Sequence, residues 1–378
     1  MAPFLQPTLD SRPIVFTEIE QFGGAERSAL ALARWLFERD LPVHILTYAD
    51  HCNLASHATH PLAVVDLNVN GTRNRIAALG AYLESRPAAA PKPLLSGYQP
   101  ALHATIAGLR GFHDLMHDTP ALFENAGERS LAARVRRTLS NRIVGFGLRS
   151  GGATIVTSEY LHAECSKDFR VQAHIARMGG LTTSHAQNSF RLRPVASGEP
   201  LRMLSVCRIE SNKRLEWILR SLAELEGSNP SLSATVNWSL DLAGKGPLLE
   251  PLTELAAQLG LADRVHFHGF VPDDQLHTLY ARAHLFLMPA VQGYGIPAIE
   301  SLQRGIPVLL HRDSGVSDIL LSTPWATVLT GGPESMAPSL RTAIDSVLRG
   351  AHHGAPLPQI PTEDEWAERV AQLCRWVP

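Results

Sequence analysis

The most constraining feature of this sequence is an alternation of short β-rich runs with amphipathic helical stretches, which occurs twice along the chain. After the first β-rich run, the segment AERSALALARWLFERD places apolar residues three and four positions apart, as one face of a helix requires. Strand, helix and strand in this order predict a parallel sheet covered by helices. In the first half, the predicted strands lie at residues 12–17, 41–48, 61–67, 92–97, 111–116 and 153–157.

The alternation restarts after a polar stretch at 179–200 that is rich in Gly and Pro. A chain of 378 residues is too long for one ordinary domain and suits two. We therefore predict an α/β protein with two Rossmann-like, doubly wound parallel-sheet domains at 1–190 and 200–362, with the linker between them. A terminal helix at 363–378 is expected to pack back on the N-terminal domain. In the second half, the predicted strands lie at residues 201–207, 239–243, 264–268, 284–288 and 306–311.

Several common catalytic motifs are missing from the sequence. It has no GxGxxG after the first strand, no GxxxxGK[ST], no GxSxG and no prominent DxD pair that could bind a metal-bridged diphosphate. The four cysteines lie far apart and form no metal-ligand spacing, which suits a reducing compartment. No metal, separate cofactor or nucleic-acid partner is expected.

The most informative stretch is MPAVQGYGIPAIESLQRGIPV at 288–308, which reads as a strand end, a loop, a helix and a turn into another strand. Gly293 and Gly295 let backbone approach a ligand closely, and Pro297 suits the first turn of the following helix. The amides at that helix's N-terminus would face an anion. Glu300 can accept hydrogen bonds from vicinal hydroxyls such as those of a ribose. A plain glycine-rich turn with a dipole-compensating glutamate is the alternative interpretation.

This stretch resembles the region EGFGxPxxEAxxxGxPV of family 4 retaining glycosyltransferases. The resemblance implies a GT-B fold, in which two Rossmann-like domains face a cleft, and a nucleotide-diphospho-sugar donor bound by the C-terminal domain. It also implies retention of anomeric configuration without a metal. The positions that the resemblance assigns to donor binding here are Gln292, Gly293, Tyr294, Gly295, Ile296, Pro297 and Glu300.

Four other segments resemble the same family in order and spacing. Arg208 and Lys213 match its GRLxxxKG segment, where two cations would offset the charge of the donor diphosphate. The segments at 244–247 and 265–274 match its GxGP and vxFxGxvxxxeL patterns, and backbone around Gly269, Phe270 and Val271 would contact the base. Gly23 and Gly24 match an N-terminal GGxE segment that opens toward the donor phosphates and the acceptor.

A histidine of the N-terminal domain reaches the donor sugar in this family. His117-Asp118, about 40 residues before a TSEY segment at 157–160 that is similar to the family's vxxSeyl, is the favoured match. His113-Asp114, on the same face of the predicted strand, is the competing assignment.

Gln292 departs from the family, which usually has glutamate at this position. An amide can hydrogen-bond a sugar hydroxyl but supplies no negative charge to an oxocarbenium-like transition state. Two interpretations stay open: the position serves sugar recognition only, or the protein is a catalytically weakened donor-binding subunit.

Taken together, the resemblance implies a hexosyltransferase acting on a glycan or lipid-linked acceptor in bacterial surface polysaccharide assembly. A sugar-nucleotide epimerase and a phosphorylase of the same fold are the enzymatic alternatives. The expected location is the cytoplasm, because the sequence has no apolar run of about 18 residues.

One basic segment of the sequence is a candidate for contact with a membrane surface. AARVRRTLSNRIVGFGLRS at 132–150 has five arginines, no acidic residue and interleaved apolar residues. It is either an amphipathic element that meets an anionic inner membrane or an ordinary basic helix packed on the sheet.

Overall fold

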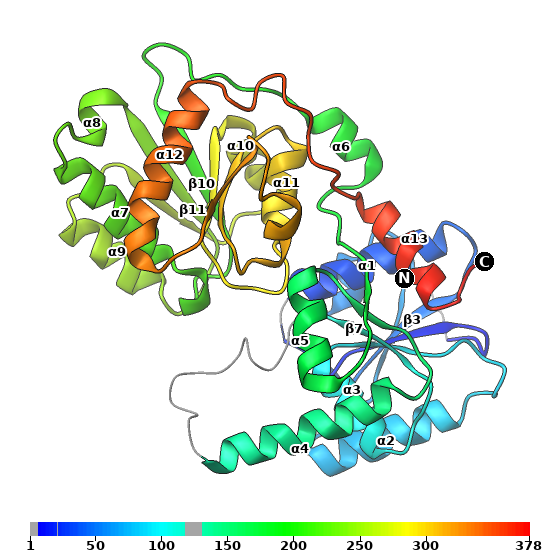
Figure 1. Cartoon of the computed structure of the whole chain (residues 1–378). Coiled ribbons are helices and arrows are strands. Elements are labelled where there is room, and N and C mark those ends of the chain that lie inside the picture. Colours follow the sequence, from blue (N-terminus) through cyan, green and yellow to red (C-terminus); the bar gives the residue numbers. More distant parts are fainter. Residues whose placement is uncertain (1–6, 21, 118–130) are drawn as a thin grey trace. The chain divides into compact units, whose positions relative to one another are not determined.

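The computed structural model describes residues 7–20, 22–117 and 131–378, and its contacts divide the chain into two compact units. The first unit comprises residues up to 178 together with 363–378, and the second is Gly179–Thr362. Each unit holds a parallel sheet with helices in the connections (Figure 1), so the predicted α/β fold with two doubly wound sheets is confirmed.

The first unit has the sheet order β5-β3-β1-β6-β7-β8-β9, and all of these strands pair in parallel. Its strands are β1 (Arg12–Val15), β3 (Val43–Thr47), β5 (Ala63–Asp66), β6 (Leu94–Ser96), β7 (His113–Met116), β8 (Thr154–Val156) and β9 (His174–Ile175), with β2 (Glu18–Ile19) and β4 (Ala49–Asp50) forming a separate pair. Its helices are α1 (Gly24–Phe37), η1 (Leu54–His57), α2 (Thr72–Glu84), α3 (Tyr98–Ile106), α4 (Leu131–Leu148), α5 (Glu159–Phe169) and α13 (Glu363–Leu373).

The terminal helix α13 packs against α1 within the first unit (Figure 1). Arg27 and Arg34 of α1 pair with Glu363 and Asp364 at the start of α13, at 3.3 and 2.6 Å. Trp376, just after α13, donates from its indole Nε1 to the Lys92 carbonyl at 3.1 Å, which fixes the end of the chain beside β6.

The second unit has the sheet order β12-β11-β10-β13-β14-β15, again entirely parallel. Its strands are β10 (Leu201–Val206), β11 (Trp238–Ala243), β12 (Val265–Gly269), β13 (Leu285–Met288), β14 (Val308–His311) and β15 (Ala326–Leu329). Its helices are α6 (Thr183–Ser189), η3 (Ser211–Lys213), α7 (Leu215–Gly227), α8 (Leu232–Thr235), α9 (Leu249–Gln258), α10 (Asp273–Arg282), α11 (Ile296–Gln303), η4 (Gly315–Ile319), η5 (Pro333–Ser335) and α12 (Met336–Leu348).

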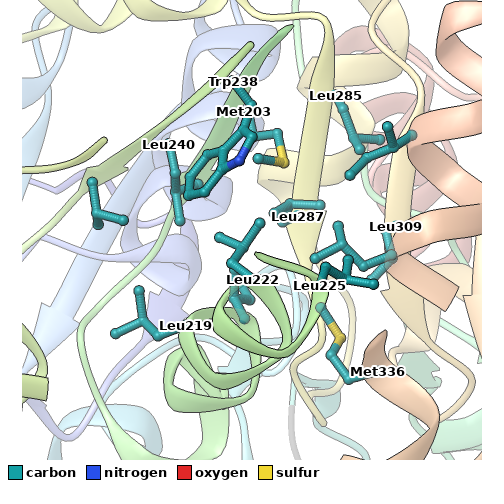
Figure 2. Packing of buried hydrophobic residues seen from close by; sticks show 14 of the residues in the cluster. Met203, Leu219, Leu222, Leu225, Trp238, Leu240, Leu285, Leu287, Leu309 and Met336 are labelled. Carbon is teal, nitrogen blue, oxygen red and sulfur yellow. The ribbon is translucent and has the colours of Figure 1, made fainter. Parts of the chain in front are cut away.

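The core of the second unit forms where the apolar stripe of α7 meets the strands. Leu219, Leu222 and Leu225 of α7 recur every three residues and are buried against β10, β11 and β13 (Figure 2). Met203 and Trp238 from the neighbouring strands β10 and β11 and Met336 of α12 complete this cluster (Figure 2).

The stretch at 179–200, predicted as the interdomain linker, is included in the second unit and contains α6. Hydrogen bonds connect it to α11: the Leu181 amide donates to Gln303 Oε1 at 2.8 Å, and Arg193 Nη1 donates to the Arg304 carbonyl at 2.9 Å. Because these hydrogen bonds attach the stretch at 179–200 to the second unit, it groups with that unit and not as a separate linker.

Candidate functional site

The best candidate site lies where strand order reverses in the second sheet. The chain runs outward from β10 to β11 and β12 on one side, and from β13 to β14 and β15 on the other. Ligands of open α/β sheets bind beyond the carboxyl ends of the strands at such a switch point. The loops that follow β10 and β13 meet here, and the Val291 amide donates to the Asn212 carbonyl at 3.3 Å.

Lys213 and Gln292 are the side chains that this switch point brings together. Lys213 Nζ donates to Gln292 Oε1 at 2.7 Å, and Gln292 Nε2 lies 3.0 Å from Met288 Sδ. The backbone of Gln292 is also tied to the loop after β14, because the Gly315 amide donates to the Gln292 carbonyl at 3.0 Å. Gln292 is therefore held by its side chain to the loop after β10 and by its backbone to the loop after β14.

Arg208 follows the same strand, β10, but is less constrained. Its side chain is about half exposed and pairs with Glu210 at 3.1 Å. Arg208 and Lys213 thus share one edge of the sheet, where their charge is available to an anionic ligand. An anionic ligand that binds Arg208 would have to replace the Glu210 carboxylate as its partner.

The loop after β13 leads directly into α11. Gly295 is the N-cap with φ +140°, where a Cβ would stand 2.6 Å from Met288 Cε and 2.9 Å from Gln292 Nε2. Pro297 lies in the first turn of α11, as expected from the sequence. Gly293 and Tyr294 are buried, and Ser314 donates to the Tyr294 carbonyl at 2.9 Å. The glycines therefore allow a compact turn that carries Ile296 and Pro297 into the helix.

Glu300 is buried on α11, with 5% of its surface exposed. Tyr280 of α10 donates its hydroxyl to Glu300 Oε2 at 2.9 Å, and the Arg304 guanidinium lies 4.4 Å from the Tyr280 ring centroid. The carboxylate is thus positioned by a neighbouring helix.

The GKGP segment after β11 packs against the loop after β10. A Cβ on Gly244 would lie 1.8 Å from the Cys207 carbonyl oxygen, and one on Gly246 would lie 2.2 Å from that of Ile209. Close backbone packing thus accounts for both glycines, and a bound phosphate is not needed to explain them.

The base-contact candidates follow β12. Gly269 ends the strand with φ +63°, Phe270 is 67% exposed, and Val271 is partly buried. Lys245 Nζ lies 5.2 Å from the Phe270 ring centroid. An exposed aromatic ring with a cation over its face is available at this end of the sheet.

In the first unit, Gly23 and Gly24 form the N-terminus of α1. The Gly23 amide donates to Glu26 Oε2 at 3.0 Å, so the glutamate of the GGAE segment caps its own helix.

The two candidate histidines lie at opposite ends of β7. His113 begins the strand at its amino end, and its Nδ1 accepts the Ala153 amide at 3.0 Å. His117 follows the carboxyl end, where its Nε2 is buried without a hydrogen-bond partner among the described residues. Burial lowers the pKa of both imidazoles to about 4, so both are neutral at pH 7. Asp118 lies outside the described residues.

Sequence reasoning missed Tyr280 and Ser314. Ser314 follows β14 at the carboxyl edge of the sheet, a position that could have marked it. Tyr280 gave no such signal, because it occupies an ordinary buried position of an amphipathic helix.

Over the part of the chain that the structure describes, no three or more His, Cys, Asp or Glu side chains cluster as metal ligands would. In the same ranges, no helix combines the length and hydropathy that a membrane crossing requires.

A match to a known protein family lies in the second half of the sequence. Residues 188–348 match the family described as Glycosyl transferases group 1. The chain is 29% identical over 166 residues to a GDP-mannose-dependent alpha-(1-6)-phosphatidylinositol monomannoside mannosyltransferase of Mycolicibacterium smegmatis, spanning 41% of each chain. It is 28% identical over 153 residues to the putative colanic acid biosynthesis glycosyltransferase WcaL of Salmonella typhimurium, spanning 39% of this chain and 35% of the relative. These alignments therefore cover less than half of either relative.

The fold is similar over nearly the whole chain to solved glycosyltransferase structures. WaaG, a glycosyltransferase involved in lipopolysaccharide biosynthesis, superposes with a TM-score of 0.71 at 17% identity, covering 96% of this chain and 99% of WaaG. The chain thus has the fold of these structures, and the candidate site lies within the residues that match the group 1 glycosyltransferase family.

Proposed function

We propose that this chain is a metal-independent retaining glycosyltransferase. In this proposal it moves a hexose from a nucleotide-diphospho-sugar to a glycan or lipid-linked acceptor in bacterial surface polysaccharide assembly. The observation that carries the proposal is the contact between Lys213 and Gln292 at the switch point of the second sheet. It joins a cation suited to a diphosphate with an amide suited to a sugar hydroxyl, inside the residues that match the glycosyltransferase family.

The donor diphosphate would lie against Lys213 and Arg208, with the amides at the start of α11 facing its oxygens. Bond cleavage between the sugar and the diphosphate leaves negative charge on the departing group. Fixed cations and helix-terminal amides stabilise that charge more in the transition state than in the bound substrate. In this arrangement, protein groups provide the positive charge that a metal ion provides in metal-dependent transferases.

His117 would contribute to sugar recognition as a neutral group. Its lowered pKa keeps the imidazole uncharged at pH 7, so it can donate or accept a hydrogen bond to a hydroxyl. Glu300, oriented by Tyr280, would accept hydrogen bonds from the ribose.

The test is a thermal-shift screen of the full chain against UDP-, GDP-, ADP- and dTDP-sugars. The mycobacterial relative is named as GDP-mannose-dependent, so GDP-mannose is the first donor to test. A donor at 100 times its dissociation constant should stabilise the folded state by about 2.7 kcal/mol. Failure of every sugar nucleotide to stabilise the chain would contradict the proposal.

A second candidate is a donor-binding subunit without turnover, and Gln292 is the observation that favours it. Calorimetric titration of the stabilising donor, combined with a turnover assay, separates binding from catalysis. Product analysis without acceptor distinguishes an epimerase, which converts the donor alone, from a transferase.

A further inference from the structure

An exposed apolar stripe runs along helix α4 of the first unit. Val135, Leu139 and Phe146 are 60%, 59% and 57% exposed. Their spacings of four and seven residues place them on one face of the helix, over about 17 Å of its axis at 1.5 Å per residue. Three large apolar side chains on one helix face are more than the scattered exposure of an ordinary surface.

The opposite face of α4 explains why this stripe points outward. The helix packs against α3 and α5 (Figure 1). A Cβ on Gly147 would lie 1.9 Å from Thr105 Oγ1 of α3, and one on Gly145 would lie 2.5 Å from the Phe169 carbonyl oxygen of α5. These close approaches fix the rotation of the helix, so the stripe cannot turn into the core.

Arginines flank the stripe. Arg134, Arg136 and Arg142 are exposed, and none of them forms an ion pair with any residue in the described ranges. Arg110 places its guanidinium 4.7 Å from the Phe146 ring centroid. On the inward side, by contrast, Arg137 pairs with Asp168 at 3.5 Å. Within the described ranges, the exposed side of α4 therefore combines apolar side chains with arginines that form no ion pair.

We propose that this face of α4, defined by Val135, Leu139, Arg142 and Phe146 with Arg134 beside them, docks the first unit on an anionic lipid bilayer. The apolar side chains enter the boundary between headgroups and acyl chains, and the guanidinium groups contact lipid phosphates. A second copy of the same face is a poorer partner, because its arginines would repel these. The proposal goes beyond sugar transfer and does not depend on it.

Vesicle sedimentation of the full chain tests this docking. Wild-type protein should bind vesicles of phosphatidylcholine mixed with phosphatidylglycerol and should not bind phosphatidylcholine alone. The double variant Arg134→Gln/Arg142→Gln should bind roughly thirtyfold more weakly, which corresponds to about 1 kcal/mol per arginine. Val135→Ser/Leu139→Ser should also weaken binding, since it removes the apolar part of the face.

The matched control is Arg220→Gln/Arg349→Gln, which removes two exposed arginines from the second unit and should bind as the wild type does. Circular dichroism confirms that each variant is folded. Absence of wild-type binding to the anionic vesicles, or equal binding by all three variants, overturns the proposal. A different result would also overturn it: the wild type is a dimer in analytical ultracentrifugation, Val135→Ser/Leu139→Ser dissociates this dimer, and neither protein binds the vesicles.

Discussion

Lys213 and Gln292 are separated by 79 positions in the chain, yet Lys213 Nζ lies 2.7 Å from Gln292 Oε1. The contact exists because β10 and β13 are neighbours in the sheet, so the loops after them begin at the same edge. It gives the candidate donor site a cation and an amide in a fixed relation.

Lys213→Ala should remove most of the transfer activity. Loss of one group that stabilises a developing anion costs about 3 kcal/mol or more, so kcat should fall at least a hundredfold. Arg208→Ala should act in the same direction. Lys167→Ala is the control, because that lysine side chain is 70% exposed on α5 of the other unit. Full transfer by both site variants, measured with the donor found in the screen, would remove Lys213 and Arg208 from the donor site.

Substitutions of Gln292 test whether this position serves sugar recognition or requires a negative charge. Gln292→Leu removes both hydrogen-bonding atoms from a similar volume and should lower kcat/KM by tenfold or more. Gln292→Glu keeps an acceptor toward Lys213 and should retain transfer within about tenfold of the wild type, if the position serves recognition only. Steady-state kinetics on both variants measure these changes. Turnover that starts only with Gln292→Glu would instead identify a donor-binding subunit that has lost its catalytic charge.

Tyr280→Phe should destabilise the second unit. The substitution removes the hydroxyl that donates to Glu300 Oε2, and loss of a hydrogen bond to a buried carboxylate costs about 1–3 kcal/mol. Urea unfolding should show a lower midpoint, and the affinity for a nucleoside diphosphate should fall because Glu300 is less well oriented. Thr278→Val is the control on the same helix, since its hydroxyl donates to the Asp274 carbonyl at an exposed position. Equal midpoints for Tyr280→Phe and wild type would show that this bond does not stabilise the fold.

The two histidines of β7 should separate activity from stability. His117→Leu is expected to lower kcat with little change in the unfolding midpoint, because leucine fills a similar volume and His117 Nε2 makes no hydrogen bond with the described residues. His113→Gln is expected to lower the midpoint while the folded fraction keeps its kcat, since His113 holds the Ala153 amide. Kinetics and urea unfolding on the same preparations measure both. The reverse pattern would assign the catalytic role to His113.

Buried histidines should make the first unit sensitive to acid. His44, His113 and His117 have pKa values lowered to about 4 by burial, against about 6.5 in the unfolded chain. Between these values the unfolded chain binds more protons, so the free energy of unfolding falls as pH drops from about 6.5 to 4. Asp114 opposes this trend, because burial raises its pKa well above the usual value and the folded state keeps its proton.

Urea midpoints measured across this window test the prediction. His117→Gln removes one of these titrating groups, so the free energy of unfolding should change with pH less steeply, by up to about 1.4 kcal/mol per pH unit. An unchanged pH dependence in this variant would mean that folding does not lower the pKa of His117.

Local sequence was sufficient where the determining information is local. The period of apolar residues predicted α1 and α7, and buried β-rich runs predicted the strands of both sheets except the edge strands β9 and β15. The short strands β2 and β4 were not predicted, because two residues each carry no periodic signal. Likewise, nothing local marks Tyr280 as the partner of Glu300, because the two lie on different helices.

The sequence by itself determined the two α/β units and the glycine-flanked loop before α11, because turn chemistry and apolar periodicity depend on near neighbours. Only the tertiary structure decided that Lys213 meets Gln292, that Tyr280 meets Glu300, and that α4 turns its apolar stripe outward. The reason is the same in each case. Strand order and helix packing decide which distant residues meet, and periodicity alone does not specify them.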